Sequence, residues 1–213
     1  MARILLIGGG GHCKSVLDCV LGMGAYGDIA IIDRQYAGRK AILGIPAIGA
    51  DDDLPSLRRA GWTDAFISLG SIGNPHRRRA LYDQLREIGF GIPCIVDETA
   101  AVSGNARLGS GVFVGKKAVI NAGTYIGTCV IINSGAIVEH DSKVGAFSHI
   151  SPGAVLCGGV TIGQDTHVGA NAVVRQKIVI GNNALIGIGS VVTKDIPDDS
   201  EAYGNPCRVV KTI

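Results

Sequence analysis

The chain has 213 residues, 46% of them hydrophobic, and a formal net charge of +2, which together suffice for two small globular domains. The near-neutral charge gives no indication of nucleic-acid binding. No apolar stretch reaches transmembrane length and no signal-peptide pattern is present, so we expect a cytoplasmic protein without membrane insertion. The six cysteines show no Cys-x-x-Cys pairing and are expected to be buried thiols rather than disulfides or zinc ligands.

Residues 1–92 alternate short apolar strands with helical patterns, which predicts a small parallel-sheet, Rossmann-like domain. Strands are expected at Arg3–Ile7, Ile29–Asp33 and Ala65–Leu69. Helices are expected from Lys14 to about Met23, at Asp51–Ala60 and at Pro75–Ile88, the last with proline near its first turn. The basic run at 76–79 is interpreted as the solvated start of that last helix.

The glycine-rich loop Gly8–His12 follows the first strand and opens the first helix, where backbone N–H groups can hold a phosphate. The full Gly-x-Gly-x-x-Gly fingerprint is absent, because its third glycine would fall on Cys13 or Lys14, so a dinucleotide cofactor is not favoured. Asp33 ends the second strand, and Gly70 follows the third strand, where a ligand can approach the backbone. The alternative is a tight strand-to-helix turn without a ligand.

A strict six-residue period dominates the rest of the chain. Every sixth residue from Val96 to Val192 is Val, Leu or Ile, which makes seventeen positions without an insertion or an exception. Such a period belongs neither to an α-helix nor to a single strand, and it is typical of a hexapeptide-repeat parallel β-helix. Three hexads form one 18-residue triangular coil. We therefore predict a left-handed parallel β-helix in residues 93–213, with a joint at Pro93 and a capping turn at 202–206.

Two further positions of the hexad support this interpretation. If the aliphatic residue is numbered i, glycine is frequent at i+1, where it supplies a positive φ or a close backbone approach. The residue at i+4 is mostly small and is expected inside the corner of the coil. The inward positions are therefore i and i+4.

Three histidines of the repeat, His140, His149 and His167, occupy positions expected to point outward. His149 and His167 are 18 residues apart and should stack on successive coils. His140 and His149 are nine residues apart, half a coil, and should face different sides of the prism. If both serve one site, a neighbouring subunit must close it, so we expect an oligomer with intersubunit active sites.

His140 is flanked by Glu139 and Asp141. A carboxylate beside an imidazole can orient the ring and raise its basicity, as a general base requires, although a plain surface histidine remains the alternative. A three-histidine zinc site needs a different spacing from the nine and 18 residues found here, so no metal is expected. Cys157 lies near the predicted groove and is interpreted as a bystander.

Together these segments resemble a known family. The order Gly8–His12, Asp33, Leu69–Asn74 followed by Arg77, Val138–Asp141 and Phe147–Ser151 is similar to that of nucleotide-sugar acetyltransferases. These include the bacillosamine-pathway and perosamine N-acetyltransferases and the sialic-acid O-acetyltransferase-like group. The resemblance covers nearly the whole chain. It implies acetyl-CoA as cosubstrate, and homotrimers that bind it in the groove between β-helices.

The resemblance also implies roles for individual residues. His140 matches the general base, and Asp141 matches the acidic residue that increases its basicity. The positions implied for acetyl-CoA are His149, Gly158, Ala170 and Ile188. The positions implied for the nucleotide sugar are Gly10, Gly11, His12, Asp33, Arg34 and Gly70. Arg34 departs from an acidic residue in one relative, which leaves the nucleotide and the sugar open.

The sequence therefore predicts an acetyl-CoA-dependent N-acetyltransferase that acts on the amine of a nucleotide-linked amino sugar in glycan biosynthesis. A UDP-sugar is among the expected substrates, and GDP- and dTDP-sugars stay open. One alternative is O-acetylation of a sugar hydroxyl by the same fold. Another is a non-catalytic solenoid that binds a sugar nucleotide.

Overall fold

The computed structural model describes residues 1–38 and 41–213, and it divides into two compact units. The first unit comprises Met1–Gly70 and His76–Glu98, and the second comprises Ser71–Pro75 and Thr99–Ile213. The chain thus enters the second unit for five residues and returns. The sequence predicted a boundary after residue 92. In the structure, residues 93–98 belong to the first unit and the loop 71–75 belongs to the second.

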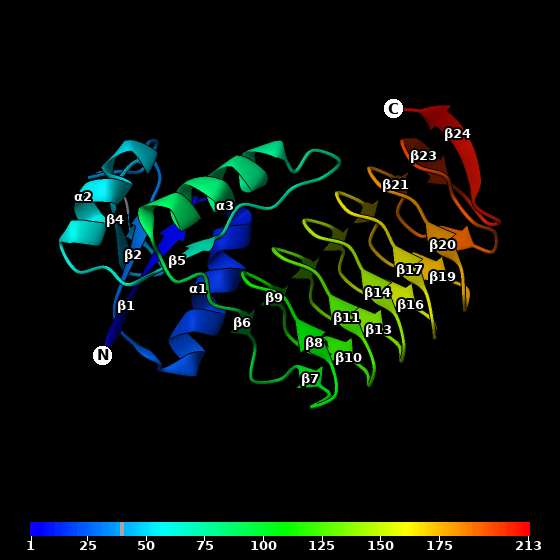
Figure 1. Cartoon of the computed structure of the whole chain (residues 1–213), viewed down its shortest axis with the longest axis horizontal. Coiled ribbons are helices and arrows are strands. Elements are labelled where there is room, and N and C mark those ends of the chain that lie inside the picture. Colours follow the sequence, from blue (N-terminus) through cyan, green and yellow to red (C-terminus); the bar gives the residue numbers. More distant parts are fainter. Residues whose placement is uncertain (39–40) are drawn as a thin grey trace. The chain divides into compact units, whose positions relative to one another are not determined.

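The first unit is an α/β domain built on one five-stranded sheet (Figure 1). Its elements are β1 (Ala2–Ile7), α1 (Gly11–Met23), β2 (Tyr26–Ile32), β3 (Ala41–Ile42), β4 (Ile45–Gly49), the 3₁₀ turn η1 (Asp51–Asp53), α2 (Leu54–Arg59), β5 (Asp64–Ile67), α3 (His76–Ile88) and β6 (Ile95–Val96). The sheet order is β3-β4-β2-β1-β5, with β1, β2, β4 and β5 parallel, which confirms the Rossmann-like prediction.

One pair of strands and one buried side chain of this unit were not predicted from the sequence. Strands β3 and β4 form an antiparallel pair at the sheet edge, within a segment to which no strand was assigned. The basic run is not uniformly solvated either, because Arg78 is only 3% exposed. Arg78 precedes the buried Leu81 by three residues and the buried Leu85 by seven, so all three lie on the buried face of α3.

The second unit is a parallel β-helix built of two-residue strands. Its strands are β7 (Ala101–Val102), β8 (Arg107–Leu108), β9 (Phe113–Val114), β10 (Val119–Ile120), β11 (Tyr125–Ile126), β12 (Ile131–Ile132), β13 (Ile137–Val138), β14 (Lys143–Val144), β15 (His149–Ile150), β16 (Val155–Leu156), β17 (Thr161–Ile162), β18 (His167–Val168), β19 (Val173–Val174), β20 (Val179–Ile180), β21 (Leu185–Ile186), β22 (Val191–Val192), β23 (Ser200–Tyr203) and β24 (Arg208–Thr212). Each strand from β7 to β22 ends on the aliphatic residue of its hexad.

Three sheets form the faces of this helix. The first face holds β7, β10, β13, β16, β19 and β22, the second holds β8, β11, β14, β17 and β20, and the third includes β9, β12, β15, β18, β21, β23 and β24. Paired residues on successive coils are 18 apart, as in Val119 with Ile137 and His149 with His167. Three hexads per coil are therefore confirmed. The predicted cap proves to be a hairpin in which β24 pairs antiparallel with β23.

The aliphatic residues of the hexads form the core of the second unit. The fourteen from Val114 to Val192 are at most 1% exposed. Burial of each such side chain contributes about 1.5–3 kcal/mol to stability. The residues at i+4 are also buried, among them Ala136, Ser148 and Ala172 with no exposed area. The structure therefore confirms i and i+4 as the inward positions.

Positive φ angles occur at a different hexad position from the one expected. Glycines at i+1 show only the close approach: a Cβ on Gly145 would lie 2.4 Å from the backbone nitrogen of Gln164 on the next coil. The left-handed residue is instead at i+3 in every turn from Gly111 to Gly189, whether that residue is glycine or not. Lys117, with φ 55°, and Phe147, with φ 60°, adopt it. Sequence reasoning placed it at i+1 because glycine is most frequent there.

Candidate active site

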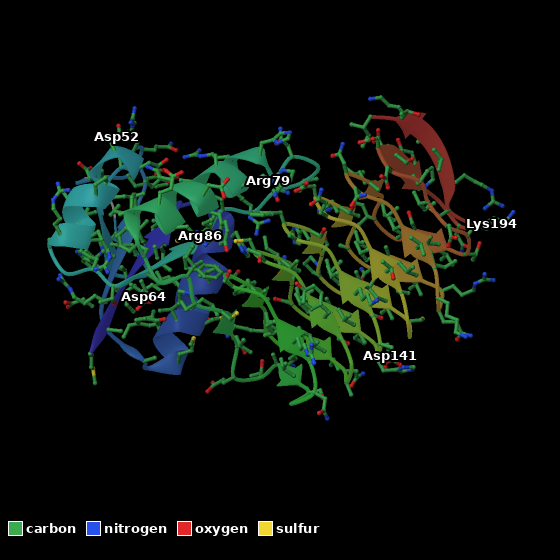
Figure 2. All side chains as sticks on the ribbon, viewed as in Figure 1. Asp52, Asp64, Arg79, Arg86, Asp141 and Lys194 are labelled. Atoms are coloured by element: carbon green, nitrogen blue, oxygen red, sulfur yellow. The ribbon has the colours of Figure 1, made fainter. Side chains whose placement is uncertain are left out.

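His140 and Asp141 form a hydrogen-bonded dyad in the turn between β13 and β14. The Asp141 Oδ2 atom lies 2.8 Å from His140 Nδ1. Asp141 is the i+3 residue of its hexad and has a φ of 60°, and this left-handed conformation accompanies the approach of its carboxylate to the neighbouring ring. The His140 side chain is 64% exposed and that of Asp141, labelled in Figure 2, is 74% exposed. A chemically useful pair is thus open to a ligand from outside the coil.

The dyad has the electrostatics of a general base. The hydrogen bond to Asp141 raises the pKa of His140, and the charges of Asp141 and Glu139 raise it further. With Nδ1–H donating to the carboxylate, the neutral ring presents the lone pair of Nε2. The backbone is fixed from both sides, because Asp141 N donates to Ala122 O and His140 O accepts from Gly159 N. Nε2 is therefore the atom that can accept a proton from a substrate.

Gly158 lies beside the ring of His140. A Cβ on Gly158 would be 2.7 Å from Nε2 and 2.8 Å from Cε1 of His140, so the ring edge occupies the space that a side chain would take. Gly158 was predicted among the acetyl-CoA positions, and the structure places it next to the predicted base, one coil further along.

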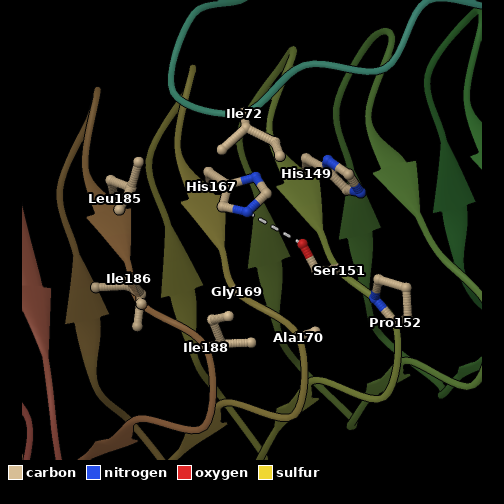
Figure 3. Close-up of a pocket in the computed structure, with 11 residues that line it drawn as sticks. Ile72, His149, Ser151, Pro152, His167, Gly169, Ala170, Leu185, Ile186 and Ile188 are labelled. Carbon is tan, nitrogen blue, oxygen red and sulfur yellow. Dashed lines mark hydrogen bonds between the residues drawn. The ribbon is translucent and has the colours of Figure 1, made fainter.

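The other three predicted acetyl-CoA positions line one pocket on the third face (Figure 3). The pocket has a volume of about 360 Å³ and includes His149, Ala170 and Ile188. Its other lining residues are Ile72, Ser151, Pro152, His167, Gly169, Leu185, Ile186 and Gly187. Most of these are apolar, so the pocket suits an aliphatic portion of a ligand, with a few polar atoms at one side.

His149 and His167 stack on successive coils, as predicted, but both are buried. They occupy outward positions of β15 and β18 and are only 9% and 7% exposed. The loop 71–75 accounts for part of this: His149 Nδ1 donates to the Ser71 carbonyl at 3.0 Å, and Ile72 lies over the histidines in Figure 3. Asn133 Nδ2 lies 3.1 Å from His149 Nε2, which fixes the second ring nitrogen.

Sequence reasoning assigned no site role to His167. Its ring meets that of His149 edge to face at 4.9 Å, and its Nε2 lies 3.2 Å from Ser151 Oγ. Burial lowers the pKa of His167, so the ring is neutral in this pocket at neutral pH. Its spacing of 18 from His149 was the only signal in the sequence that could have placed it here.

In the first unit, the glycine loop is held by Asp33. Asp33 Oδ2 accepts a hydrogen bond from Gly9 N at 2.7 Å, and Oδ1 accepts one from Gln35 N at 2.9 Å. Gly10 caps α1 and Gly11 is its first residue, and neither would bring a Cβ within 4 Å of another atom. The backbone N–H groups at the start of α1 are therefore accessible to a ligand.

A polar pocket of about 430 Å³ adjoins Asp33. It is lined by Asp33, Arg34, Gln35, Asp51 and Arg77. The Arg34 guanidinium pairs with Asp52, and Arg77 lies 3.6 Å from Asp51. Asp33 and Arg34, two of the six positions predicted for the nucleotide sugar, thus share a pocket with Arg77. The resemblance to the family included Arg77 in a motif but gave it no role.

Of the remaining nucleotide-sugar positions, His12 and Gly70 are neighbours. A Cβ on Gly70 would lie 3.5 Å from the Cβ of His12, an ordinary contact. His12 is half-buried, and its burial together with the Arg78 guanidinium lowers its pKa to about 4. His12 is therefore a neutral hydrogen-bonding group at neutral pH rather than a cation.

Other features of the described residues bear on the alternatives. Within residues 1–38 and 41–213, no helix is long and apolar enough to cross a membrane, and no three His, Cys, Asp or Glu side chains group closely enough to hold a metal ion. None of the six cysteines, all of which the structure describes, forms a disulfide; four are buried and two, Cys94 and Cys157, are half-exposed.

Comparison with known proteins identifies the family. A family model described as the PglD N-terminal domain matches residues 3–85. The model of the bacterial transferase hexapeptide matches 141–176, and that of the hexapeptide repeat of succinyl-transferase matches 104–128 and 159–194. A search of curated proteins found no match.

Solved structures match over nearly the full length of the chain. A perosamine N-acetyltransferase from Caulobacter crescentus, in complex with CoA and GDP-perosamine, is 36% identical over 99% of this chain and 98% of its own, with a TM-score of 0.93. The acetyltransferase domain of PglB from Neisseria gonorrhoeae, with acetyl coenzyme A, is 36% identical over 98% of both chains, with a TM-score of 0.92. WeeI from Acinetobacter baumannii, 24% identical over 99% of this chain and all of its own, shares the fold with a TM-score of 0.89. The chain belongs to the nucleotide-sugar acetyltransferases with a left-handed hexapeptide-repeat β-helix, and it is an acetyl-CoA-dependent acetyltransferase.

Proposed function

We propose that this protein transfers the acetyl group of acetyl-CoA to the amine of a nucleotide-linked amino sugar, with His140 as the general base. The observation that carries the proposal is the dyad: Asp141 holds Nδ1 at 2.8 Å and leaves Nε2 accessible. The perosamine N-acetyltransferase that matches the whole chain binds GDP-perosamine, itself a nucleotide-linked amino sugar, so a GDP-linked substrate is the first to assay.

The chemistry is a direct transfer. Nε2 of His140 takes a proton from the amine as its nitrogen attacks the thioester carbonyl, and the C–N bond forms. The tetrahedral intermediate then collapses, the C–S bond breaks, and the departing CoA sulfur takes up a proton. Asp141 stabilises the imidazolium between these two steps. Neither a metal nor an acyl-enzyme is needed in this transfer.

The remaining predicted residues divide into two groups. The apolar pocket with His149, Ala170 and Ile188 would hold acetyl-CoA, with Gly158 contributing where the acetyl group meets His140. The loop residues Gly10, Gly11, His12 and Gly70, together with Asp33 and Arg34, would hold the nucleotide sugar. The backbone N–H groups at the start of α1 suit its phosphates.

The reaction is tested with a panel of UDP-, GDP- and dTDP-linked amino sugars. Release of the CoA thiol is followed by a thiol reagent, and acetylation of the sugar is followed by mass spectrometry. Matched sugars with a hydroxyl in place of the amine distinguish O-acetylation. The His140→Ala variant should lose about 10²–10⁴-fold in kcat. An unaltered kcat in that variant would refute the assigned base, and binding without CoA release from any sugar would favour the non-catalytic alternative.

The active form is proposed to be a homotrimer with its sites between subunits. The dyad lies in the turn after β13, a strand of the first face. The proposed acetyl-CoA pocket lies on the third face, so one chain presents the dyad and the pocket on different sides of the β-helix. The outward residues of the first face are all aliphatic and none is buried: Ala101, Val119, Ile137, Val155, Val173 and Val191. On the second face, Lys143 and Thr161 interrupt such a row. An exposed aliphatic row of this kind is typical of the core of a subunit interface.

Two experiments test this assembly. Val173→Lys on the first face should dissociate the trimer in light scattering, whereas the control Val179→Lys on the second face, at a residue that is 47% exposed, should not. At an acetyl-CoA concentration far below the raised KM of Ala170→Trp, co-expressed His140→Ala and Ala170→Trp subunits should regain about a quarter of wild-type activity if each site uses His140 and the pocket from different subunits. Mixed trimers as inactive as the separate variants would show that each subunit forms its own site.

A further inference from the structure

The side chains of His140 and Asp141 are largely exposed, so few neighbouring groups can hold them in one orientation. His140 and Asp141 have most of their side-chain surface in solvent, and their mutual hydrogen bond alone leaves both free to rotate together. A general base must be held to within a few tenths of an ångström to be efficient. The residues on the preceding and following coils, 18 positions away, are the ones that can restrict them.

On the following coil, Gly158 leaves room for the ring of His140. The ring approaches so closely that a Cβ there would be 2.7 Å from Nε2, the atom proposed to accept the proton. The backbone of Gly158 is outside the positive-φ region, so its conformation is open to any L-residue. The ring, rather than the backbone, is what requires glycine at this position.

On the preceding coil, Gly123 leaves room for the carboxylate of Asp141. A Cβ on Gly123 would lie 2.6 Å from Asp141 Oδ1. Gly123 has a φ of 73°, but the same turn position elsewhere holds Lys117, Cys129 and Phe147 with φ between 53° and 60°. Non-glycine residues are therefore accommodated at this turn position in other coils, and here the carboxylate is the group in the way.

Glycine also occupies these two hexad positions on other coils, where its surroundings can be compared. Gly104, which is at i+2 like Gly158, has nothing within 4 Å of its would-be Cβ. Gly135, at i+3 like Gly123 and with a φ of 66°, has one backbone nitrogen at 4.0 Å. The approach to Gly158 thus has no counterpart at Gly104, whereas the approach to Gly123 recurs at Gly153, also at i+3, where a Cβ would come still closer to Oδ1 of Asn171 on the next coil.

We propose that Gly123 and Gly158 are positioning residues of the transfer reaction: their missing side chains form two recesses that orient the Asp141 carboxylate and keep His140 Nε2 open to the substrate amine. This inference rests on the proposed role of His140 as base. It gives the glycines separate tasks. Gly123 acts through Asp141 on the basicity of the ring, and Gly158 acts on access to the ring.

The test compares Gly123→Ala and Gly158→Ala with the matched controls Gly135→Ala and Gly104→Ala. Gly135→Ala carries the same positive-φ strain as Gly123→Ala but lacks the contact with a carboxylate. Gly104→Ala, at the hexad position of Gly158, adds the same methyl group without a neighbouring ring. We expect both dyad variants to lose about 10- to 100-fold in kcat with a smaller change in KM, and both controls to stay near wild type. Circular dichroism and thermal melting establish that each variant is folded.

An NMR titration of labelled histidine, with the His140 signal assigned by its absence in His140→Ala, adds a readout that a purely structural role would not move. Gly123→Ala should lower the pKa of His140, because it displaces the carboxylate that raises it. In an Asp141→Asn background, Gly123→Ala should cost little more, because the carboxylate is already gone. Gly158→Ala, which imposes no positive-φ strain, carries the kinetic test if Gly123→Ala does not fold.

The outcomes separate this inference from the proposed function. Wild-type kcat in His140→Ala would refute the base, whereas the titration would still report whether Gly123 orients Asp141. Wild-type kcat and an unchanged His140 titration in folded Gly123→Ala and Gly158→Ala would overturn the positioning role. Equal losses in the two control variants would overturn it as well, since the loss would then belong to the turns in general.

Discussion

The half-buried His12 should make the first unit sensitive to mild acid. Burial and the neighbouring Arg78 guanidinium lower its pKa from 6.5 to about 4 in the folded protein. Between these pH values the unfolded chain binds a proton that the folded chain does not bind. The free energy of unfolding therefore falls as the pH falls through this range, and above pH 6.5 His12 has no such effect.

The size of the effect follows from the shift. Each pKa unit corresponds to 1.36 kcal/mol, so the full cost approaches about 3 kcal/mol below pH 4. At pH 5 the unfolded imidazole is almost fully protonated and the folded one is mostly neutral, which gives a loss of about 2 kcal/mol relative to pH 7.5. That is a large share of the stability of a small domain. The variant His12→Asn should lack this loss.

The single tryptophan, Trp62, provides the assay, because it lies in the first unit and is 7% exposed. Denaturant unfolding followed by its fluorescence, at a series of pH values from 7.5 to 4.5, gives the pH slope for wild type and His12→Asn. The control is His76→Asn, which removes an exposed histidine from the same unit. Equal slopes for wild type and His12→Asn would refute the reasoning, whatever the stability of the variant at neutral pH.

Three further outcomes are expected. Asp141→Asn should move the acid limb of the kcat/KM profile to lower pH, because the hydrogen bond to the carboxylate raises the pKa of His140, and the plateau should fall about tenfold or more; an unmoved limb would contradict the dyad. Ala170→Trp should fill the apolar pocket and raise KM for acetyl-CoA in initial-rate assays, with the KM for the sugar nearly unchanged. Ile132→Ala in the core should cost about 2–5 kcal/mol, seen as a lower melting temperature by circular dichroism.

The repeat could be predicted because its signal is local. One aliphatic residue at each sixth position determines where every strand ends, and it predicts the 18-residue register that pairs His149 with His167. The left-handed turn residue was misplaced because different residue types occupy it: Lys117 and Phe147 carry no sequence signal for a positive φ. The antiparallel pair β3 and β4 was not predicted, because strands this short carry no periodic pattern in the sequence.

The candidate site was only partly predictable because several of its contacts join distant segments. His140 and Asp141 are adjacent and were identified from the sequence. The burial of His149 depends on a hydrogen bond to Ser71, 78 residues earlier, which no local pattern encodes. Arg78 lies within a run of like charges, and only the packing of α3 shows that this one arginine faces inward, beside His12.

The turn geometry explains how two adjacent residues of a structural repeat can interact through their side chains. In a strand, adjacent side chains point to opposite faces, so neighbouring residues cannot act together there. A left-handed residue at i+3 removes this restriction, and at Asp141 it accompanies a carboxylate that reaches the ring of the residue before it. Every turn from 111 to 189 repeats this backbone, so the backbone alone does not select the site. What distinguishes residues 140 and 141 is the ring beside Gly158, because the carboxylate next to Gly123 has a counterpart in the Asn171 side chain next to Gly153. A His-Asp pair moved to another turn would therefore keep its hydrogen bond and lose the open Nε2 wherever a side chain occupies the position that corresponds to Gly158.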